Sequence, residues 1–573
     1  MVNAMKNEKV ASILDRIADF MEMQGDIFRM KAYRKAAHTV ETLSDDITTL
    51  TKENRLEELP GIGIHIAAKI EEIVETGTAQ YFEKLKKEYP VDFDALLSVE
   101  GLGLKSIKLL YDELGVQNLD DLERHAKRHH IRRLKGMGDK KEKKIRENIE
   151  IARRNTGRKL LGHIMPLAEA LKHQIEVLKV VETVEIAGSI RRRKESVGDI
   201  DLLVISSDSQ QVMDYFVNLP MVEGVVVKGP LKTTVRLKIG MDCDLRVFNR
   251  DIFGAALMYF TGSRELNVEM RKIAISHNLK LSEWGLFQED TVVAGKTEED
   301  VFHALGMQYI PPELRENRGE IEASLEGTLP QLIGYGDIKG DLQVHSYWSD
   351  GENTLKEMVN QAMKMGYQYL AFTDHVETSR TTKGMDENDI LNQMEEINSL
   401  NDSNNDFKII KGLELEIDFE GNLPIDDNIL DEVDLVVASV HSDLRHDFFE
   451  MTDRMINAME NPYVNIISHP TGRRIQEQQE YELNLDLVLE TARDTGTLME
   501  INSQPNRLDL RDIYIKKAIS IGCQLVVNSD AHHIHEMKNM LLGMATARRG
   551  WARREDILNT MDLKDILKAL SKK

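Results

Sequence analysis

The sequence predicts a multidomain protein of mixed α+β and α/β class: a helical amino-terminal region, a middle region on a mixed sheet, and a carboxyl-terminal distorted (β/α) barrel. Its 573 residues, 41% of them hydrophobic, can fill several cores. The first 155 residues show helical apolar spacing, as at Val10, Ile13, Leu14 and Ile17. Strand-like runs begin after about residue 156. After residue 337 such runs alternate with helical segments, which indicates a parallel sheet or barrel.

The composition indicates the cellular compartment and the class of partner. Only Cys243 and Cys523 occur, which predicts no disulfide framework and a reducing cytoplasm. The first residues show neither a signal-peptide core nor a membrane span. The net charge is −23, but the charges are unevenly distributed along the chain. Residues 101–200 carry 23 basic and 15 acidic side chains, whereas residues 301–573 carry 27 basic and 48 acidic side chains. The cationic part favours a polyanionic partner. The acidic part fits either solubility or carboxylates around metal ions.

One element occurs three times in the helical region. The copies are "LPGIGIHIAAKI" at 59–70, "VEGLGLKSIKLL" at 99–110 and "LKGMGDKKEKKI" at 134–145. Each resembles the helix-hairpin-helix, in which a glycine turn and a helix N-terminus bind a nucleic-acid backbone. A single copy fits a helix–helix corner equally well, but three copies favour DNA binding. The predicted DNA contacts are Gly61, Gly63, His65, Gly101, Gly103, Lys105, Gly136 and Gly138.

A first chemical site is expected around "GSIRRRKESVGDID" at 188–201. Asp199 and Asp201 lie at i and i+2 of a strand and therefore share one face. Asp244, in the strand-like "DCDLRVF", can add a third carboxylate. Such a set suits two-metal nucleotidyl transfer with Mg²⁺ or Mn²⁺. The cations at 191–194 are then expected to face the phosphates. For the Asp pair alone, a helix cap or surface turn is the structural alternative.

These residues resemble the nucleotidyltransferase superfamily, and "YFTGSRELNVEMR" at 259–271 resembles the X-family DNA polymerases. The resemblance implies metal binding by Asp199, Asp201 and Asp244. It also implies nucleotide contacts by two groups of residues. The triphosphate group, with its turn, is Gly188, Ser189, Arg192 and Gly198, and the sugar and base-pair group is Tyr259, Phe260, Gly262, Asn267 and Arg271.

The lyase domain of the same family is matched less fully. "KAYRKAA" at 31–37 fits, and Lys69 falls where that family carries its Schiff-base nucleophile. His65 and Arg29 stand where the lyases carry lysines. The resemblance therefore implies binding of a 5′-phosphate, while 5′-deoxyribose-phosphate lyase activity and a plain surface role for Lys69 both stay open.

Six short segments rich in histidine and acidic residues follow one another in the carboxyl-terminal half: "GDLQVHSYWSDG" at 340–351, "TDH" at 373–375, "GLELE" at 412–416, "SVHS" at 439–442, "SHPTGR" at 468–473 and "SDAHH" at 529–533. In this order they resemble the motifs of the PHP (polymerase and histidinol phosphatase) domain. The resemblance implies the metal ligands His345, Asp350, His375, Glu414, His441, His469, Asp530 and His532. Gln343 takes the place of the usual first histidine. Five histidines with three carboxylates suit a Mn²⁺ or Zn²⁺ cluster.

The combined resemblance implies six segments. They are a lyase-like helical domain at 1–85, a fingers-type helical domain at 86–155, a nucleotidyltransferase palm at 156–250, a thumb-type domain at 251–315, a linker at 316–336 and a PHP domain at 337–573.

The expected function is gap filling in DNA repair, including base excision, with 3′–5′ exonuclease action and cleavage at abasic sites as a further activity. The expected partners are dNTPs and gapped or primed duplex DNA with a 5′-phosphate, bound by a cytoplasmic, nucleoid-associated monomer that does not bind membranes. Two other classes stay open: a nucleotidyltransferase or phosphatase acting on small molecules, and a non-catalytic DNA-end scaffold.

Overall fold

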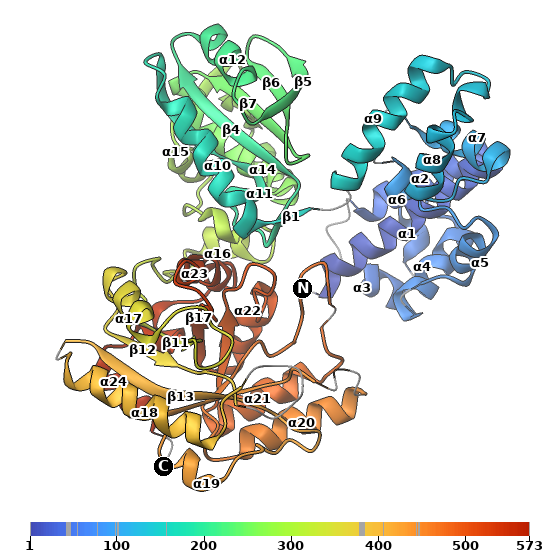
Figure 1. Ribbon diagram of the computed structural model, residues 1–573. Helices are drawn as coiled ribbons and strands as arrows, with labels where there is room; N and C mark the ends of the chain where they lie inside the picture. Colours follow the sequence, from blue (N-terminus) through green and yellow to red (C-terminus); the bar gives the residue numbers. More distant parts are fainter. Residues whose placement is uncertain are drawn as a thin grey trace. The chain divides into compact units, whose positions relative to one another are not determined.

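The computed structural model describes residues 2–41, 47–53, 55–76, 78–97, 99, 102–155, 158–376, 384–404, 406–442, 444, 447–478 and 480–571. The chain divides into two compact units (Figure 1). One unit comprises Met1–Arg158 and Lys238–Met241, and the other comprises Lys159–Leu237 and Asp242–Lys573.

The first unit is helical and packs around α1 (Val2–Gln24), whose Leu14, Ile17 and Met21 are fully buried. The other helices are α2 (Ile27–Glu41), α3 (Ile47–Lys52), α4 (Ile64–Thr76), α5 (Gln80–Glu88), α6 (Phe93–Leu97), α7 (Leu104–Leu114), α8 (Leu119–Lys127) and α9 (Asp139–Asn155), with 3₁₀ turns η1 (Leu56–Glu58) and η2 (Ile131–Arg133). The helices α4, α7 and α9 each begin directly after the second glycine of a predicted repeat.

The second unit begins with a five-stranded sheet of order β2-β4-β7-β6-β5. Its strands are β2 (Val181–Ile186), β4 (Asp199–Ser206), β5 (Val222–Lys228), β6 (Lys232–Leu237) and β7 (Asp242–Phe248). The pair β4–β7 is parallel and the other pairs are antiparallel, so the sheet is mixed as predicted. Next to it lie a small β1 (Lys159–Leu160) and β3 (Ser196–Val197) pair, α10 (Leu161–Glu176), α11 (Gly188–Arg191) and α12 (Ser209–Val217).

A second small subdomain follows the mixed sheet. It contains η3 (Arg250–Ile252), α13 (Phe253–Thr261), α14 (Arg264–Ser276), β8 (Lys280–Ser282), β9 (Gly285–Gln288), β10 (Thr291–Ala294), α15 (Glu298–Ala304), η4 (Pro312–Leu314) and α16 (Glu320–Glu326). The three strands form one antiparallel sheet. The helices α13, α14 and α15 share a core with Ala255, Met258, Leu266 and Phe302.

The carboxyl-terminal part is a barrel of seven parallel strands in sequence order. They are β11 (Gly340–Val344), β12 (Tyr369–Phe372), β13 (Lys408–Glu416), β14 (Leu435–Ser439), β15 (Ile466–Ile467), β16 (Leu498–Asn502) and β17 (Leu525–Asn528). Hydrogen bonds between the ends of the first and last strands nearly close it: His345 N donates to Ala531 O at 2.9 Å and Asp530 N donates to Gln343 O at 3.1 Å.

Helices cover the outside of the barrel (Figure 1). They are α17 (Leu355–Lys364), α18 (Glu387–Asp402), α19 (Asp427–Leu430), α20 (Phe448–Glu460), α21 (Leu485–Thr495), α22 (Asp512–Ile521), α23 (Met540–Arg549) and α24 (Leu563–Leu570), with short turns η5 (Met537–Asn539), η6 (Arg554–Asp556) and η7 (Leu558–Thr560). The predicted fold class is confirmed. In the described part of the chain, no helix has the length and apolarity that crossing a bilayer requires.

Candidate metal centres and nucleotide site

Three carboxylates meet at the start of two neighbouring strands of the mixed sheet. Asp199 and Asp201 lie on β4, and Asp244 on β7 is the register partner of Asp201. Asp244 accepts hydrogen bonds from Thr234 Oγ1 at 2.5 Å and from Arg246 at 2.9 Å. Burial, together with the charges of Asp199 and Asp244, raises the pKa of Asp201 to about 7. Carboxylate oxygens of this kind are candidate ligands for divalent cations.

The turn before α11 is pressed against this cluster. Gly188 has a φ of +61°, and a Cβ atom at this position would lie 2.3 Å from Asp201 Oδ2. Only glycine combines the left-handed backbone with the required space. The following Ser189 is half-buried, and Gly198, just before Asp199, is exposed.

The cations after this turn have partners in the subdomain of α13–α16. Arg191 donates to both carboxylate oxygens of Glu298, at 2.8 and 2.6 Å, and the fully buried Arg315 donates to the same group at 2.6 Å. Burial alone would raise the pKa of Glu298, but Arg315 and Arg191 lower it to about 2. The expectation that the whole basic run faces phosphates does not hold for Arg191, because this buried ion pair takes up its guanidinium.

Arg192, the residue after Arg191, contacts different groups. Its Nε donates to Glu316 Oε1 at 3.0 Å, and its Nη1 donates to the carbonyl oxygen of Thr261. Lys194 Nζ lies 3.5 Å from Glu316 Oε2. Sequence reasoning did not identify Glu298 or Glu316, because neither residue stands near the basic run in the chain.

The predicted sugar and base-pair residues gather at the end of α13 and the start of α14. Asn267 Nδ2 donates to Tyr259 O at 2.7 Å, and Arg271 Nε donates to Asn267 O at 3.1 Å. The rings of Tyr259 and Phe260 meet edge to face at 5.1 Å. Gly262, which ends α13, has a φ of +70°. These contacts place the five predicted residues in one region.

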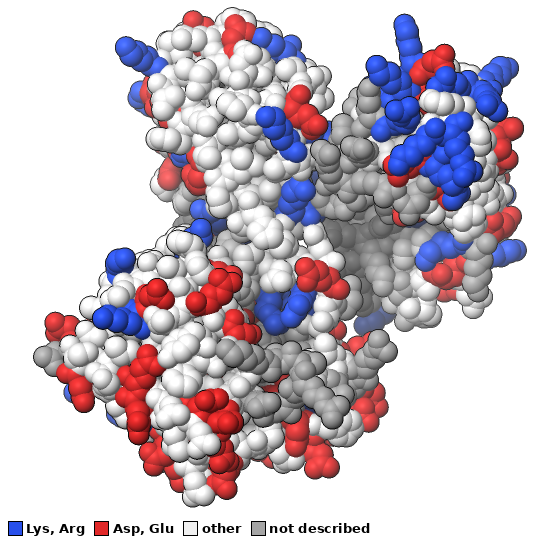
Figure 2. Space-filling view, in the orientation of Figure 1, with Lys and Arg blue, Asp and Glu red and all other residues white. Residues whose placement is uncertain are grey.

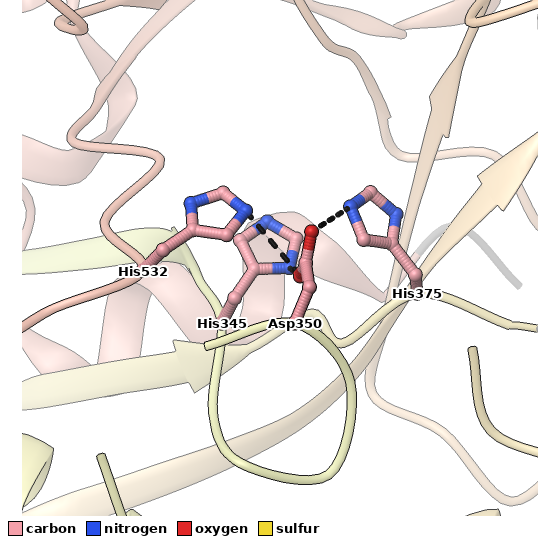
Figure 3. A group of neighbouring side chains, drawn as sticks. All are labelled: His345, Asp350, His375 and His532. Atoms are coloured by element: carbon pink, nitrogen blue, oxygen red, sulfur yellow. Dashed lines mark ion pairs between the residues drawn. The ribbon is translucent and has the colours of Figure 1, made fainter. Parts of the chain in front are cut away.

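A second cluster lies where the barrel strands end. His345, Asp350, His375 and His532 form one group that could hold a metal ion (Figure 3). Two further groups share members with it: His375, Glu414 and His441, and His345, Glu414 and Asp530. His469 joins through Nε2, which lies 3.3 Å from His441 Nε2 and 3.6 Å from Glu414 Oε1. All eight predicted ligands therefore lie in one connected cluster.

The contacts within this cluster fit metal binding better than internal hydrogen bonding. His345 Nε2 lies 3.2 Å from Asp530 Oδ1 and 3.3 Å from Glu414 Oε2. Nevertheless, among the described residues neither ring nitrogen of this buried histidine has a partner in hydrogen-bond geometry, and the same holds for His469 Nδ1. Buried polar atoms without partners are costly. Nitrogen and oxygen atoms that converge on one space, several of them without a hydrogen bond, are what a shared cation requires.

Gln343 lies inside the same cluster and is fully buried. Its Nε2 donates to Glu414 Oε2 at 3.2 Å, whereas its Oε1 has no hydrogen-bond partner within the described part of the chain. The amide thus offers one neutral oxygen to the cluster.

The charges of the cluster control its protonation. Burial would raise the pKa of Glu414, but His375 and His345 hold it well below its usual value. Burial and the charge of His469 outweigh the carboxylates to lower the pKa of His441 to about 4. A neutral imidazole is the form that binds a metal.

Two buried acids, Asp374 and Glu500, hold the loops that carry the predicted ligands. Sequence reasoning did not single them out. Asp374 accepts from Ser346 N at 2.7 Å and from Gln393 Nε2 at 2.6 Å. Glu500 accepts from His469 N at 2.7 Å. Burial and the charge of Asp530 raise the pKa of Glu500 well above its usual value. The position of Glu500 near the end of the strand-like "LMEINS" was the only available signal.

The helical unit presents the predicted DNA contacts at its surface. Ile62, Leu102 and Met137, the apolar residues between the paired glycines, are buried. The described members of the predicted set are exposed: Gly61, Gly63, His65, Gly103, Lys105, Gly136 and Gly138. Gly101 lies outside the described residues.

The helical unit also carries a cationic surface and the predicted lyase residue Lys69. Exposed cations gather over α8, η2 and α9 (Figure 2), namely Lys127, Arg128, Arg133, Lys135, Lys140, Lys143, Lys144 and Arg146. Half-buried Lys69 on α4 donates to His65 O at 3.1 Å and stands 5.1 Å from the centre of the Tyr81 ring.

The fold and the two clusters describe a class of protein with two separate groups of candidate metal ligands, one of carboxylates and one rich in histidine, joined to a helical unit with a cationic surface. Family models agree. Residues 5–79 match the helix-hairpin-helix domain and 93–150 the SAM-like helix-hairpin-helix tandem. Residues 256–316 match the DNA polymerase beta thumb and 341–504 the PHP domain.

Similar proteins make the assignment more specific. The chain is 35% identical to the DNA polymerase/3′-5′ exonuclease PolX of Bacillus subtilis (strain 168), over 98% of this chain and 99% of the relative. It is also 30% identical to a probable phosphatase of Thermoanaerobacter sp. (strain X514), over 36% of this chain and 84% of that relative. The chain belongs to the PolX family of X-family DNA polymerases that carry a PHP domain. The predicted resemblance is confirmed.

Proposed function

We propose that this chain fills short gaps in DNA during repair and removes nucleotides from 3′ ends with its PHP barrel. The observation that carries the proposal is the presence of two distinct clusters of candidate ligands in one chain of this family: the carboxylates of β4 and β7, and the His-rich cluster of the barrel. The expected substrates are dNTPs and duplex DNA with a gap and a 5′-phosphate.

At the polymerase site, Asp199, Asp201 and Asp244 would hold Mg²⁺ or Mn²⁺. Such ions neutralise triphosphate charge and lower the pKa of an attacking hydroxyl. Gly188, Ser189, Arg192 and Gly198 would bind the triphosphate. Tyr259, Phe260 and Gly262 would lie against the sugar, with Asn267 and Arg271 beside the base pair. Thr234 and Arg246 orient Asp244 through hydrogen bonds.

At the barrel, the eight ligands would hold Mn²⁺ or Zn²⁺, with Gln343 as a weak neutral ligand. Ions in such a site polarise a phosphodiester and supply a nucleophile near neutral pH. Asp374 and Glu500 hold the ligand loops in place through backbone amides. The same chemistry would serve cleavage at abasic sites.

The helical unit would bind the DNA backbone through its three glycine turns, with the cationic surface of α8 and α9 alongside. In the cell, the protein would act in the cytoplasm, on the nucleoid, as a monomer. The lyase-like part of this unit would bind a 5′-phosphate, and a lyase reaction at Lys69 would require its amine in the neutral form.

A primer-extension assay tests both activities together. The substrate is a 5′-labelled primer that faces a one-nucleotide gap, with Mg²⁺ or Mn²⁺, with and without dNTPs. Extension should be lost in Asp201→Asn and kept in His345→Ala, and shortening should show the reverse. Asp214→Asn, an exposed carboxylate on α12, and His535→Ala, an exposed histidine outside the cluster, serve as controls. A primer that stays unchanged with wild-type protein would exclude both activities.

A further inference from the structure

The loop that carries the proposed triphosphate ligands is held by the barrel. We call residues 188–195 the phosphate loop. Arg549, the last residue of α23, donates from Nη1 to Arg192 O at 2.6 Å. Arg473, four positions after His469, donates from Nη2 to Glu195 Oε2 at 2.8 Å. Both arginine side chains are almost fully buried, at 5% and 6% exposure, so they are fixed parts of the structure.

Glu316 contacts side chains of both the phosphate loop and the barrel. Its carboxylate is contacted by Arg192 at 3.0 Å, by Arg549 at 3.1 Å and by Lys194 at 3.5 Å. Its side chain is 8% exposed. Burial would raise the pKa of Glu316, but the three cations, led by Arg549, lower it to about 2. It is therefore a carboxylate at neutral pH.

This arrangement places Glu316 in competition with a substrate. The Arg192 guanidinium, which the proposed function assigns to the triphosphate, is engaged by Glu316 and by the carbonyl oxygen of Thr261. A bound triphosphate must draw on the same group. A buried carboxylate left without a cation is strongly destabilised, so its remaining partners decide how readily Arg192 is released.

Arg549 is the partner that remains. Its Nη1 faces both Glu316 and Arg192 O, while its Nη2 donates to Asp512 at 2.6 Å. Asp512 is held in turn by Arg318 at 2.9 Å. Since Arg549 does not depend on Glu316 alone for its position, it can keep neutralising that carboxylate when Arg192 turns to a phosphate.

We propose that Arg549 of the PHP barrel is a positioning residue of the polymerase: by neutralising Glu316 and holding the backbone of Arg192, it leaves the Arg192 guanidinium available for the triphosphate of the incoming dNTP. The barrel thereby sets the nucleotide affinity of the polymerase site. The inference rests on the proposed role of Arg192.

The neighbouring Arg548 offers a matched control. It donates to Glu313 at 2.8 Å and to Ile333 O at 2.6 Å, and its guanidinium stands 4.9 Å from the centre of the Tyr335 ring. It therefore joins the barrel to residues 313–335 with as many contacts as Arg549 makes, but these contacts do not include Arg192 or Glu316.

The test is steady-state insertion of one nucleotide into gapped DNA by the full-length protein. Arg549→Met should raise the KM for dNTP by about tenfold or more, which corresponds to the loss of one buried charge contact, with kcat changed by less than about threefold. Arg549→Lys, which keeps the charge but loses the paired donors, should give an intermediate KM. Arg548→Met should keep the wild-type KM. The 3′–5′ exonuclease activity of each variant on single-stranded DNA reports that the barrel is folded.

A second substitution separates positioning from general damage. In Arg549→Met combined with Glu316→Gln, the KM for dNTP should fall at least about threefold below that of Arg549→Met, because a neutral amide no longer competes for Arg192, although the contact with Arg192 O stays lost. An unchanged KM in Arg549→Met, or a double variant whose KM equals that of Arg549→Met, would overturn the inference. Arg192→Ala is measured alongside: if its KM equals that of wild type, the assignment of Arg192 to the triphosphate fails instead.

Discussion

Asp201 on β4 and Asp244 on β7 are direct neighbours across a parallel strand pair, so two carboxylates of the proposed polymerase centre face the same space. Both side chains are half-buried. Burial raises the pKa of Asp201 most, and the charges of Asp199 and Asp244 raise it further, to about 7.

This relationship predicts a pH-dependent metal requirement for gap filling. A raised pKa means that Asp201 without metal takes up a proton as the pH falls through about 7, and the proton competes with the metal. The Mg²⁺ concentration for half-maximal extension should therefore rise as the pH is lowered from about 8 to about 6. Mg²⁺ titrations of gap filling at several pH values measure it. A half-maximal concentration that is constant across this range would contradict the prediction.

The buried Gln343 predicts an effect on metal occupancy. Gln343→His would replace one neutral amide oxygen by an imidazole next to Glu414, and imidazole is a stronger ligand for Mn²⁺ or Zn²⁺. We expect more tightly bound metal per chain after dialysis, measured by elemental analysis. Gln393→His, at a buried glutamine that binds Asp374 instead, is the control and should not gain metal. Equal metal content in wild type and Gln343→His would argue against a ligand position at 343.

The ion pairs of Glu298 predict acid sensitivity of the fold. The pKa of Glu298 in the folded chain is about 2, below the ordinary value of 4.5, because burial is outweighed by Arg315 and Arg191. The unfolded chain therefore binds a proton first as the pH falls. The stabilisation from this group is complete above about pH 4.5 and is lost towards pH 2.

Thermal unfolding of wild type and Glu298→Gln at a series of pH values checks this prediction. The variant should be less stable at neutral pH and should lose less of its stability on acidification, because its amide does not titrate. Glu299→Gln, at the exposed neighbouring position, should follow wild type. Parallel pH profiles of wild type and Glu298→Gln would show that the ion pairs do not supply the acid sensitivity.

The exposed Lys105, in the first turn of α7, predicts a contact with a DNA phosphate. Lys105→Ala should weaken binding to gapped duplexes of different sequence by similar factors and lower the slope of log K against log salt by about one. Fluorescence anisotropy at several salt concentrations measures both quantities. An unchanged slope would mean that this helix does not bind the backbone.

Much of the fold could be predicted from the sequence because its signals are local. The i, i+2 spacing of Asp199 and Asp201 places both on one face of any strand, and a histidine at the end of a parallel strand reaches the barrel rim wherever the helices lie. The strands of the mixed sheet and of the barrel were predicted for the same reason.

The partners of the basic run could not be predicted because they depend on tertiary structure. Arg191 meets Glu298 across 107 positions, and Arg549 meets Arg192 across 357. No periodicity or composition relates residues so far apart. The direction of the Gln343 amide, with its nitrogen towards Glu414, depends likewise on the packed cluster.

The contact between Arg473 and Glu195 has a consequence for how such a protein can evolve. A polymerase that lost its barrel would lose the cations that balance Glu195 and, in part, Glu316, and would carry surplus negative charge beside its own anionic substrate. Gene fission between the two halves would therefore favour descendants in which both acids have become neutral residues. The residues at positions 195 and 316 therefore depend on both halves of the protein.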